Sequence, residues 1–213
     1  MTAREDTHRL HARALRLEWI TTAWNIVEAF IAIGAGVAAG SIALIAFGAD
    51  SLIEVTASAA LLWRLLRAGP QATAEETELA DRRALVVVGA TFFVLAAYIG
   101  IDASAALMSR EAPDTSVVGI LLSVASLLVM PSLAYVKMTT ARRMGSRALA
   151  AEAMETWVCA YLSAALLAGL GLHQFLGWWW ADSAGALAMV PFIIWQGVRS
   201  FREARPESDD EHD

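Results

Sequence analysis

Cysteine and charge are scarce in this chain of 213 residues. Its one cysteine, Cys159, excludes an internal disulfide and any motif in which paired cysteines hold zinc or exchange electrons. Charged residues make up 18% of the chain, against about 25% in a typical soluble domain. The net charge of −6 leaves no basic face to neutralise phosphates, which excludes nucleic acid as a partner. Phosphate-loop and hydrolase motifs are also lacking, so we do not expect an enzyme.

Apolar residues make up 57% of the chain and lie in long blocks separated by short charged joints. A membrane helix needs about 20 mostly apolar residues to cross the hydrocarbon layer. Six blocks reach this length, which predicts an all-α, polytopic membrane protein that lies in the lipid bilayer. The predicted transmembrane helices are Leu17–Ala39, Ile42–Leu66, Ala84–Met108, Val117–Lys137, Leu149–Leu172 and Trp178–Arg199.

The basic residues predict how the helices are oriented. Of the 16 lysines and arginines, 15 belong to the N-terminal tail, the joints after the second and fourth helices, or the C-terminal end; only Arg110 lies in a joint of the opposite parity. The positive-inside rule then places both termini in the cytoplasm, and we expect a cell (plasma or inner) membrane location. We expect a cytoplasmic tail over residues 1–16, one membrane domain over 17–200, and an acidic cytoplasmic tail over 201–213 with no C-terminal regulatory domain.

Several carboxylates fall inside the predicted helices. Each costs about 2.5–3.5 kcal/mol at the bilayer centre, so each is a candidate functional group. No lysine or arginine is expected deep enough in a helix to neutralise them. Protons or a passing cation should therefore balance their charge. The carboxylates in question are Glu28, Asp50, Glu54, Asp102 and Glu155.

Two pairs of polar residues have the spacing of one helical face. Asp50 and Glu54 are four residues apart, as are Glu155 and Cys159. Two such pairs on facing helices supply four side-chain ligands, the number that a tetrahedral divalent metal takes. The spacing predicts a metal site formed by these four residues. Taken alone, Cys159 fits a packed apolar thiol as well as a ligand.

Four other polar residues are weaker candidates, either to contact and orient the ligands or to carry protons. Asn25 and Glu28 are three residues apart on the first helix, where they could also form an ordinary polar contact between helices. Asp102 lies near the outer end of the third helix and indicates a water-filled mouth. Asp182 is expected to cap or orient the sixth helix, with a relay role as the alternative.

The two pairs of candidate ligands lie in related sequence. Both stretches follow the pattern S-x-A-L-x-A-x-x-x-[DE]-x-x-x-[EC], beginning at Ser41 and at Ser146. These serines start from opposite faces, and Asp50 and Glu155 each lie ~13–14 Å further along their helices, near the midplane. This indicates an inverted repeat of three plus three helices with its site at mid-membrane, a common plan in transporters.

These motifs resemble the transmembrane domain of the cation diffusion facilitator (cation efflux) family. The stretch Gly40–Glu54 is similar to that family's second-helix motif, and Gly145–Ser163 to its fifth-helix motif. Trp180-Ala-Asp182 resembles the start of its sixth helix. The resemblance covers about Arg13 to Arg202.

The resemblance implies a homodimeric antiporter that moves Zn²⁺ or a similar divalent metal out of the cytoplasm in exchange for protons. It implies the ligands Asp50, Glu54, Glu155 and Cys159. The family's usual fifth-helix pair is His and Asp, and its second-helix Asp is Glu54 here. We expect Zn²⁺ as cargo, with no tightly bound cofactor. A thiolate favours Zn²⁺, Cd²⁺ or Co²⁺, and carboxylates favour Mn²⁺ or Fe²⁺. The alternative is a non-transporting membrane metal sensor or scaffold.

Overall fold

The computed structural model describes residues 3–67 and 74–204, and within these residues all regular structure is helical. This confirms the all-α prediction for the described part of the chain. The six helices are α1 (Ala3–Ala39), α2 (Ile42–Arg67), α3 (Ala74–Ser109), α4 (Val117–Met144), α5 (Arg147–Leu176) and α6 (Ala181–Glu203).

The helices extend further than the apolar blocks. Residues 3–16, expected as a polar tail, form the start of α1, and α3 begins at Ala74, ten residues before its predicted start at Ala84. These extensions are rich in Ala, Leu, Arg and Glu, which favour helix wherever the chain lies outside an apolar layer. The joint at 68–73, and the acidic tail from residue 205 onward, lie outside the described residues.

The serines of the repeated pattern cap helices. The Ser41 hydroxyl accepts a hydrogen bond from the Leu44 amide at 3.1 Å, and the Ser146 hydroxyl accepts one from the Leu149 amide at 3.3 Å. Each serine satisfies a backbone donor that the first turn of a helix leaves free. The two halves of the pattern therefore start α2 and α5 in the same way.

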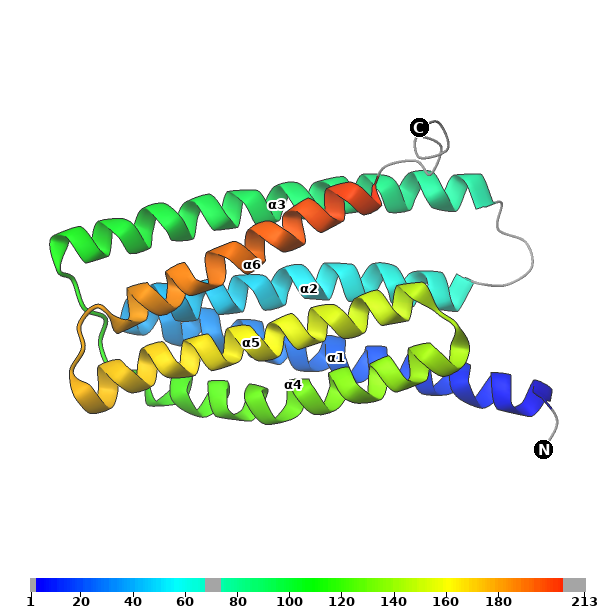
Figure 1. Cartoon of the computed structure of the whole chain (residues 1–213), viewed down its shortest axis with the longest axis horizontal. Coiled ribbons are helices and arrows are strands. Elements are labelled where there is room, and N and C mark those ends of the chain that lie inside the picture. The colour runs from blue at the N-terminus through cyan, green and yellow to red at the C-terminus, as the bar shows by residue number, and fades with distance from the viewer. Residues whose placement is uncertain (1–2, 68–73, 205–213) are drawn as a thin grey trace.

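The six helices run side by side along the long axis of the molecule (Figure 1). The largest contacts pair α1 with α2, α4 with α5 and α3 with α6, and α2 also contacts α3, α5 and α6. We call the end with the α1–α2, α3–α4 and α5–α6 connections the tryptophan end, because Trp178 and Trp180 stack there; the N-terminus lies at the opposite end. Because α2 touches four other helices, its side chains lie at the centre of the bundle.

Glycines let α1 and α2 approach closely. A Cβ atom added to Gly36 of α1 would lie 2.9 Å from the Ile45 amide nitrogen, and one added to Gly48 of α2 would lie 2.9 Å from the Ile33 amide nitrogen. Neither position has room for a side chain. Gly36 and Gly48 thus serve close packing of α1 against α2.

Five helices contain a stretch long and apolar enough to cross a membrane, as judged from residues with described side chains. Large apolar side chains remain exposed on the outside of the bundle, among them Phe30 (75% exposed), Ile101 (72%) and Leu128 (69%). Soluble monomers rarely leave so much apolar surface uncovered, whereas lipid tails would cover it. The stretches are Arg9–Ala39, Gly89–Ser109, Val117–Met144, Glu152–Leu176 and Ala181–Arg202; α2 is not among them.

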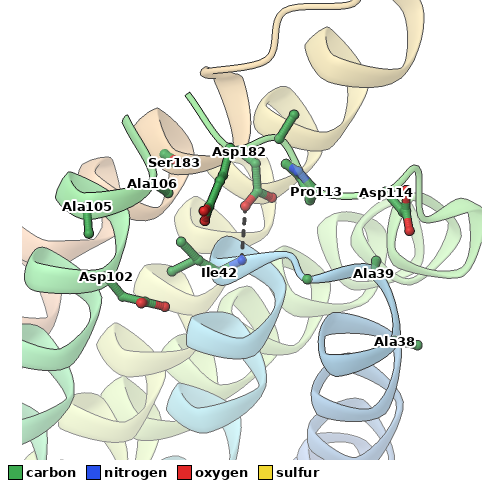
Figure 2. Close-up of a pocket in the computed structure, with 13 residues that line it drawn as sticks. Ala38, Ala39, Ile42, Asp102, Ala105, Ala106, Pro113, Asp114, Asp182 and Ser183 are labelled. Atoms are coloured by element: carbon green, nitrogen blue, oxygen red, sulfur yellow. Dashed lines mark hydrogen bonds between the residues drawn. The ribbon is translucent and has the colours of Figure 1, made fainter. Parts of the chain in front are cut away.

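Asp182 fixes the start of α2 rather than that of its own helix. One carboxylate oxygen accepts a hydrogen bond from the Ser41 hydroxyl, and the other accepts bonds from the amides of Ile42 at 3.0 Å and Ala43 at 3.4 Å. Figure 2 shows the bond from Ile42 to Asp182 across the space between the two helices. A carboxylate at a helix N-terminus satisfies free amides and interacts favourably with the helix dipole. Asp182 therefore ties α6 to α2, the helix that carries Asp50 and Glu54.

We predict that Asp182→Ala destabilises the protein by about 1–3 kcal/mol, because it leaves buried donors at the start of α2 without an acceptor. Asp182→Asn keeps an acceptor and should cost less. Thermal unfolding in detergent, followed by tryptophan fluorescence, measures both. Asp114→Ala, at an exposed position near the same end, is the matched control and should stay within about 0.5 kcal/mol of wild type. Equal unfolding temperatures for Asp182→Ala and the control would contradict the capping role.

Candidate metal centre

Three candidate ligands meet in the middle of the bundle. A carboxylate oxygen of Asp50, one of Glu54 and the sulfur of Cys159 all lie within 4.8 Å of one another. Asp50 and Glu54 come from successive turns of α2, and Cys159 comes from α5, which α2 contacts. Asp50 and Cys159 are fully buried, and Glu54 is 6% exposed. Helix packing thus gathers an acid pair and the only thiol of the chain into one apolar interior.

Several oxygens of this cluster have no hydrogen-bond partner among the described residues. They are both carboxylate oxygens of Asp50 and Oε1 of Glu54. The other oxygen of Glu54 accepts a hydrogen bond from Asn25 Nδ2 at 2.8 Å. Burying carboxylate oxygens without partners costs several kcal/mol unless a cation or a proton occupies the space that they face. The donor set of two carboxylates and a thiol fits a divalent cation.

Glu28 of α1 adjoins the same cluster. It is fully buried, and its Oε2 accepts a hydrogen bond from the Ser51 hydroxyl at 2.9 Å and contacts the Cys159 sulfur at 3.9 Å. Its Oε1 accepts a bond from Trp24 Nε1 at 3.1 Å. Asn25 and Glu28 were both predicted as partners of the site. Asn25 contacts Glu54, and Glu28 contacts Cys159.

Glu155, the fourth predicted ligand, is placed differently. It lies on α5 one turn before Cys159, is half-buried, and is not in the group that meets within 4.8 Å. Its charge is close enough to Glu54 to act on it electrostatically. The structure therefore brings together three of the four predicted residues and leaves Glu155 beside them.

Asp102 lines a cavity at the tryptophan end. The cavity has a volume of about 460 Å³ and lies where α3 and α6 meet the α1–α2 connection, with Asp182 in its wall (Figure 2). Glu111 and Asp114, from the connection between α3 and α4, also line it. Asp102 thus lies in a cavity wall, and it is not among the residues that meet within 4.8 Å. The mouth begins at Ile42, about 12 Å along α2 from Asp50.

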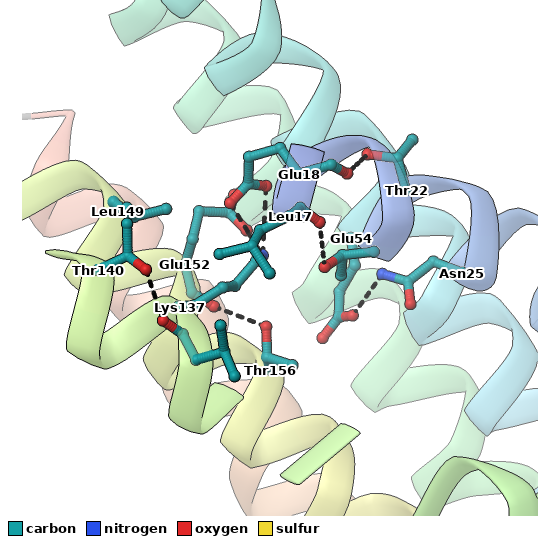
Figure 3. Close-up of polar contacts among 12 residues, drawn as sticks. Leu17, Glu18, Thr22, Asn25, Glu54, Lys137, Thr140, Leu149, Glu152 and Thr156 are labelled. Atoms are coloured by element: carbon teal, nitrogen blue, oxygen red, sulfur yellow. Dashed lines mark hydrogen bonds and ion pairs between the residues drawn. The ribbon is translucent and has the colours of Figure 1, made fainter. Parts of the chain in front are cut away.

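One cation lies deeper in the bundle than expected, although it pairs with none of the five carboxylates that the sequence singled out. Lys137 of α4 is fully buried and forms ion pairs with Glu18 of α1 at 3.1 Å and with Glu152 of α5 at 3.4 Å (Figure 3). The apolar block of this helix ends at Lys137, but α4 continues to Met144, which puts the ammonium group within the bundle. Both of these ion pairs go to glutamates away from Asp50, and among the described residues none reaches Asp50.

Trp24 and Ser51, which orient Glu28, were not predicted from the sequence. Trp24 precedes Glu28 by one helical turn, which is a readable signal, since residues four apart share a face. Ser51 gave no signal, because its contact with Glu28 joins α2 to α1 and depends on how these helices pack. The same holds for the bond from the Ser163 hydroxyl of α5 to Ser126 of α4, at 2.9 Å.

Long apolar helices around a buried cluster of acids and a thiol define a multi-pass membrane protein with a candidate cation site. Comparison with known families agrees, because residues 19–207 match the cation efflux transmembrane domain. The match covers most of the chain, and the protein therefore belongs to the cation efflux family. This confirms the resemblance drawn from the two ligand motifs.

One curated relative is described as "Uncharacterized transporter sll1263", from Synechocystis. It is 26% identical over 174 residues, which cover 80% of this chain and 56% of the relative. The chain thus spans little more than half the length of that transporter.

We predict that Lys137→Met destabilises the fold by about 3–5 kcal/mol, because it leaves Glu18 buried without a counter-ion. The triple variant Glu18→Gln, Lys137→Met, Glu152→Gln removes all three charges and should cost clearly less. Unfolding in detergent, followed by tryptophan fluorescence, compares the two. If the single variant proved as stable as the triple variant, the ion pairs would not hold α1, α4 and α5 together.

Proposed function

We propose that the protein transports a divalent metal cation across a cell membrane, with Asp50, Glu54 and Cys159 as its central binding site. In this proposal α2 also spans the membrane, which gives six spanning helices. Both termini lie in the cytoplasm, as the distribution of basic residues predicts. The membership in the cation efflux family and the relative described as a transporter support transport rather than catalysis.

The observation that carries the proposal is the state of Asp50. Both of its oxygens are fully buried, lack a hydrogen-bond partner among the described residues, and lie beside a second acid and a thiol. A purely structural polar group would be paired. A transported cation must be bound strongly enough to enter and weakly enough to leave, and unpaired oxygens offer ligands without an internal bond to break.

The donor set narrows the choice of cation. Carboxylates and a thiolate together suit borderline metals that accept both oxygen and sulfur, and Zn²⁺ is the cation that we propose. Cd²⁺ and Co²⁺ share this chemistry. Mn²⁺ and Fe²⁺ would favour the carboxylates alone.

Proton exchange follows from the same cluster. Negative groups within 4.8 Å of one another in an apolar interior cannot all stay ionised unless a cation balances them. Protons and the metal therefore compete for the same atoms. Metal entering from the cytoplasm would expel protons, and protons entering from outside would expel the metal. We propose efflux by such antiport, in a homodimer.

Cadmium binding tests the site directly. We expect Cd²⁺ added to the purified protein to produce the ultraviolet charge-transfer absorption of a cadmium thiolate, saturating at one ion per chain. Since Cys159 is the only thiol, Cys159→Ser should abolish the band. Asp50→Asn should weaken binding at least ~10-fold, because it removes a charged ligand from a buried site. Asp114→Asn, at an exposed position, is the control and should bind as wild type does.

A band that persists in Cys159→Ser would arise from another component of the preparation. A band of equal affinity in Asp50→Asn would remove Asp50 from the site. Either result would contradict the site as assigned.

Flux measurements test transport and its coupling. In inverted membrane vesicles we expect Zn²⁺ uptake driven by an acidic interior, which stops in Asp50→Ala at unchanged protein level. An uncoupler that dissipates the proton gradient should collapse uptake, because proton binding from the far side releases the metal. Uptake that is indifferent to the uncoupler would contradict antiport. Bound metal with no flux would favour the sensor or scaffold alternative.

A further inference from the structure

The three residues that meet leave a tetrahedral cation one ligand short. The spacing of residues on α5 offers Glu155 as the fourth, and the packing of α1 offers Glu28. Neither lies within 4.8 Å of all three converging atoms, so contacts and orientation must decide between them.

We propose that Glu28 of α1 is the fourth ligand of the transported cation, so that the site is built by three helices rather than two. This inference rests on the proposed function. Its donor set is three carboxylates and one thiolate, contributed by α1, α2 and α5.

The distance between Glu28 and Cys159 matches shared coordination. For a tetrahedral ion with bonds of about 2.3 Å to sulfur and about 2.0 Å to oxygen, the sulfur and oxygen atoms lie about 3.5 Å apart. In the structure, Glu28 Oε2 and the Cys159 sulfur are 3.9 Å apart, so a shift of a few tenths of an ångström closes the geometry. The thiol proton now between these atoms is what a metal replaces when the thiolate forms.

Glu28 is also held in place as metal-binding carboxylates are. Each of its oxygens accepts a hydrogen bond, one from Trp24 and one from Ser51, and such outer partners orient a ligand and fix its direction. Ser51 directly follows Asp50 on α2, so its bond ties Glu28 of α1 to the helix that carries Asp50 and Glu54.

Burial separates Glu28 from Glu155. Glu28 is fully buried, whereas Glu155 is half-buried. Glu155 lies nearer the opposite end of the bundle, one turn of α5 away from Cys159. That position suits a residue which a cation passes on its way to or from the site.

A pair of ligand-exchange variants tests the inference. Glu28→His and its control Trp24→His are each loaded with Zn²⁺ and examined by X-ray absorption at the zinc edge. Trp24 lies one turn before Glu28 and only orients it. We expect the scattering signature of a bound imidazole in Glu28→His and its absence in Trp24→His. Equal imidazole signals in both variants, or none in either, would overturn the inference.

A second pair covers the case in which Glu28→His does not fold. Glu28→Gln is nearly isosteric and keeps one acceptor, which can serve either Trp24 or Ser51. We expect it to weaken Cd²⁺ binding more than ~100-fold, beyond the ~10–100-fold typical of outer partners, and Glu155→Gln to weaken it less than ~10-fold. The reverse order would overturn the inference and leave the proposed function standing. Failure of wild-type protein to bind Zn²⁺ or Cd²⁺ would instead overturn the proposed function, and this inference with it.

Discussion

The burial of Asp50 without a hydrogen-bond partner in the described part of the chain is the constraint on which the rest of the site depends. An ionised carboxylate in such a place is unstable unless a cation or a proton balances it. The surrounding helices hold it there nonetheless, because α2 is anchored at its start by Asp182 and packed against α1 through Gly36 and Gly48. The stability of the packed bundle thus keeps in place a group that favours binding of a mobile charge.

The buried acids of the bundle are balanced in two ways. Toward the end opposite the tryptophan end, Lys137 is a permanent counter-ion of Glu18 and Glu152. This cluster joins α1, α4 and α5. Around Asp50 no such cation lies among the described residues, and unpartnered oxygens face a thiol instead. The first arrangement is suited to holding helices together, and the second to a charge that enters and leaves.

The acidic side chains on and beside α2 also differ in how fully they are hydrogen-bonded. At the tryptophan end, Asp102 and Asp182 line a cavity, and Asp182 is fully engaged with backbone amides. Deeper in the bundle, Glu54 has one oxygen bonded to Asn25 and one without a partner. Acids that lie along one helix therefore differ in role according to what the neighbouring helices present to them.

The sequence by itself determined the helical class, the apolar blocks and the acid pair of α2, because these depend on composition and on spacing within one helix. It also pointed to Cys159 through its spacing from Glu155. Only the tertiary structure decided that Cys159 meets the α2 pair while Glu155 lies beside it, and that Lys137 is buried. Such contacts depend on how far each helix extends and which face it turns to its neighbours, and no spacing within a single helix encodes that.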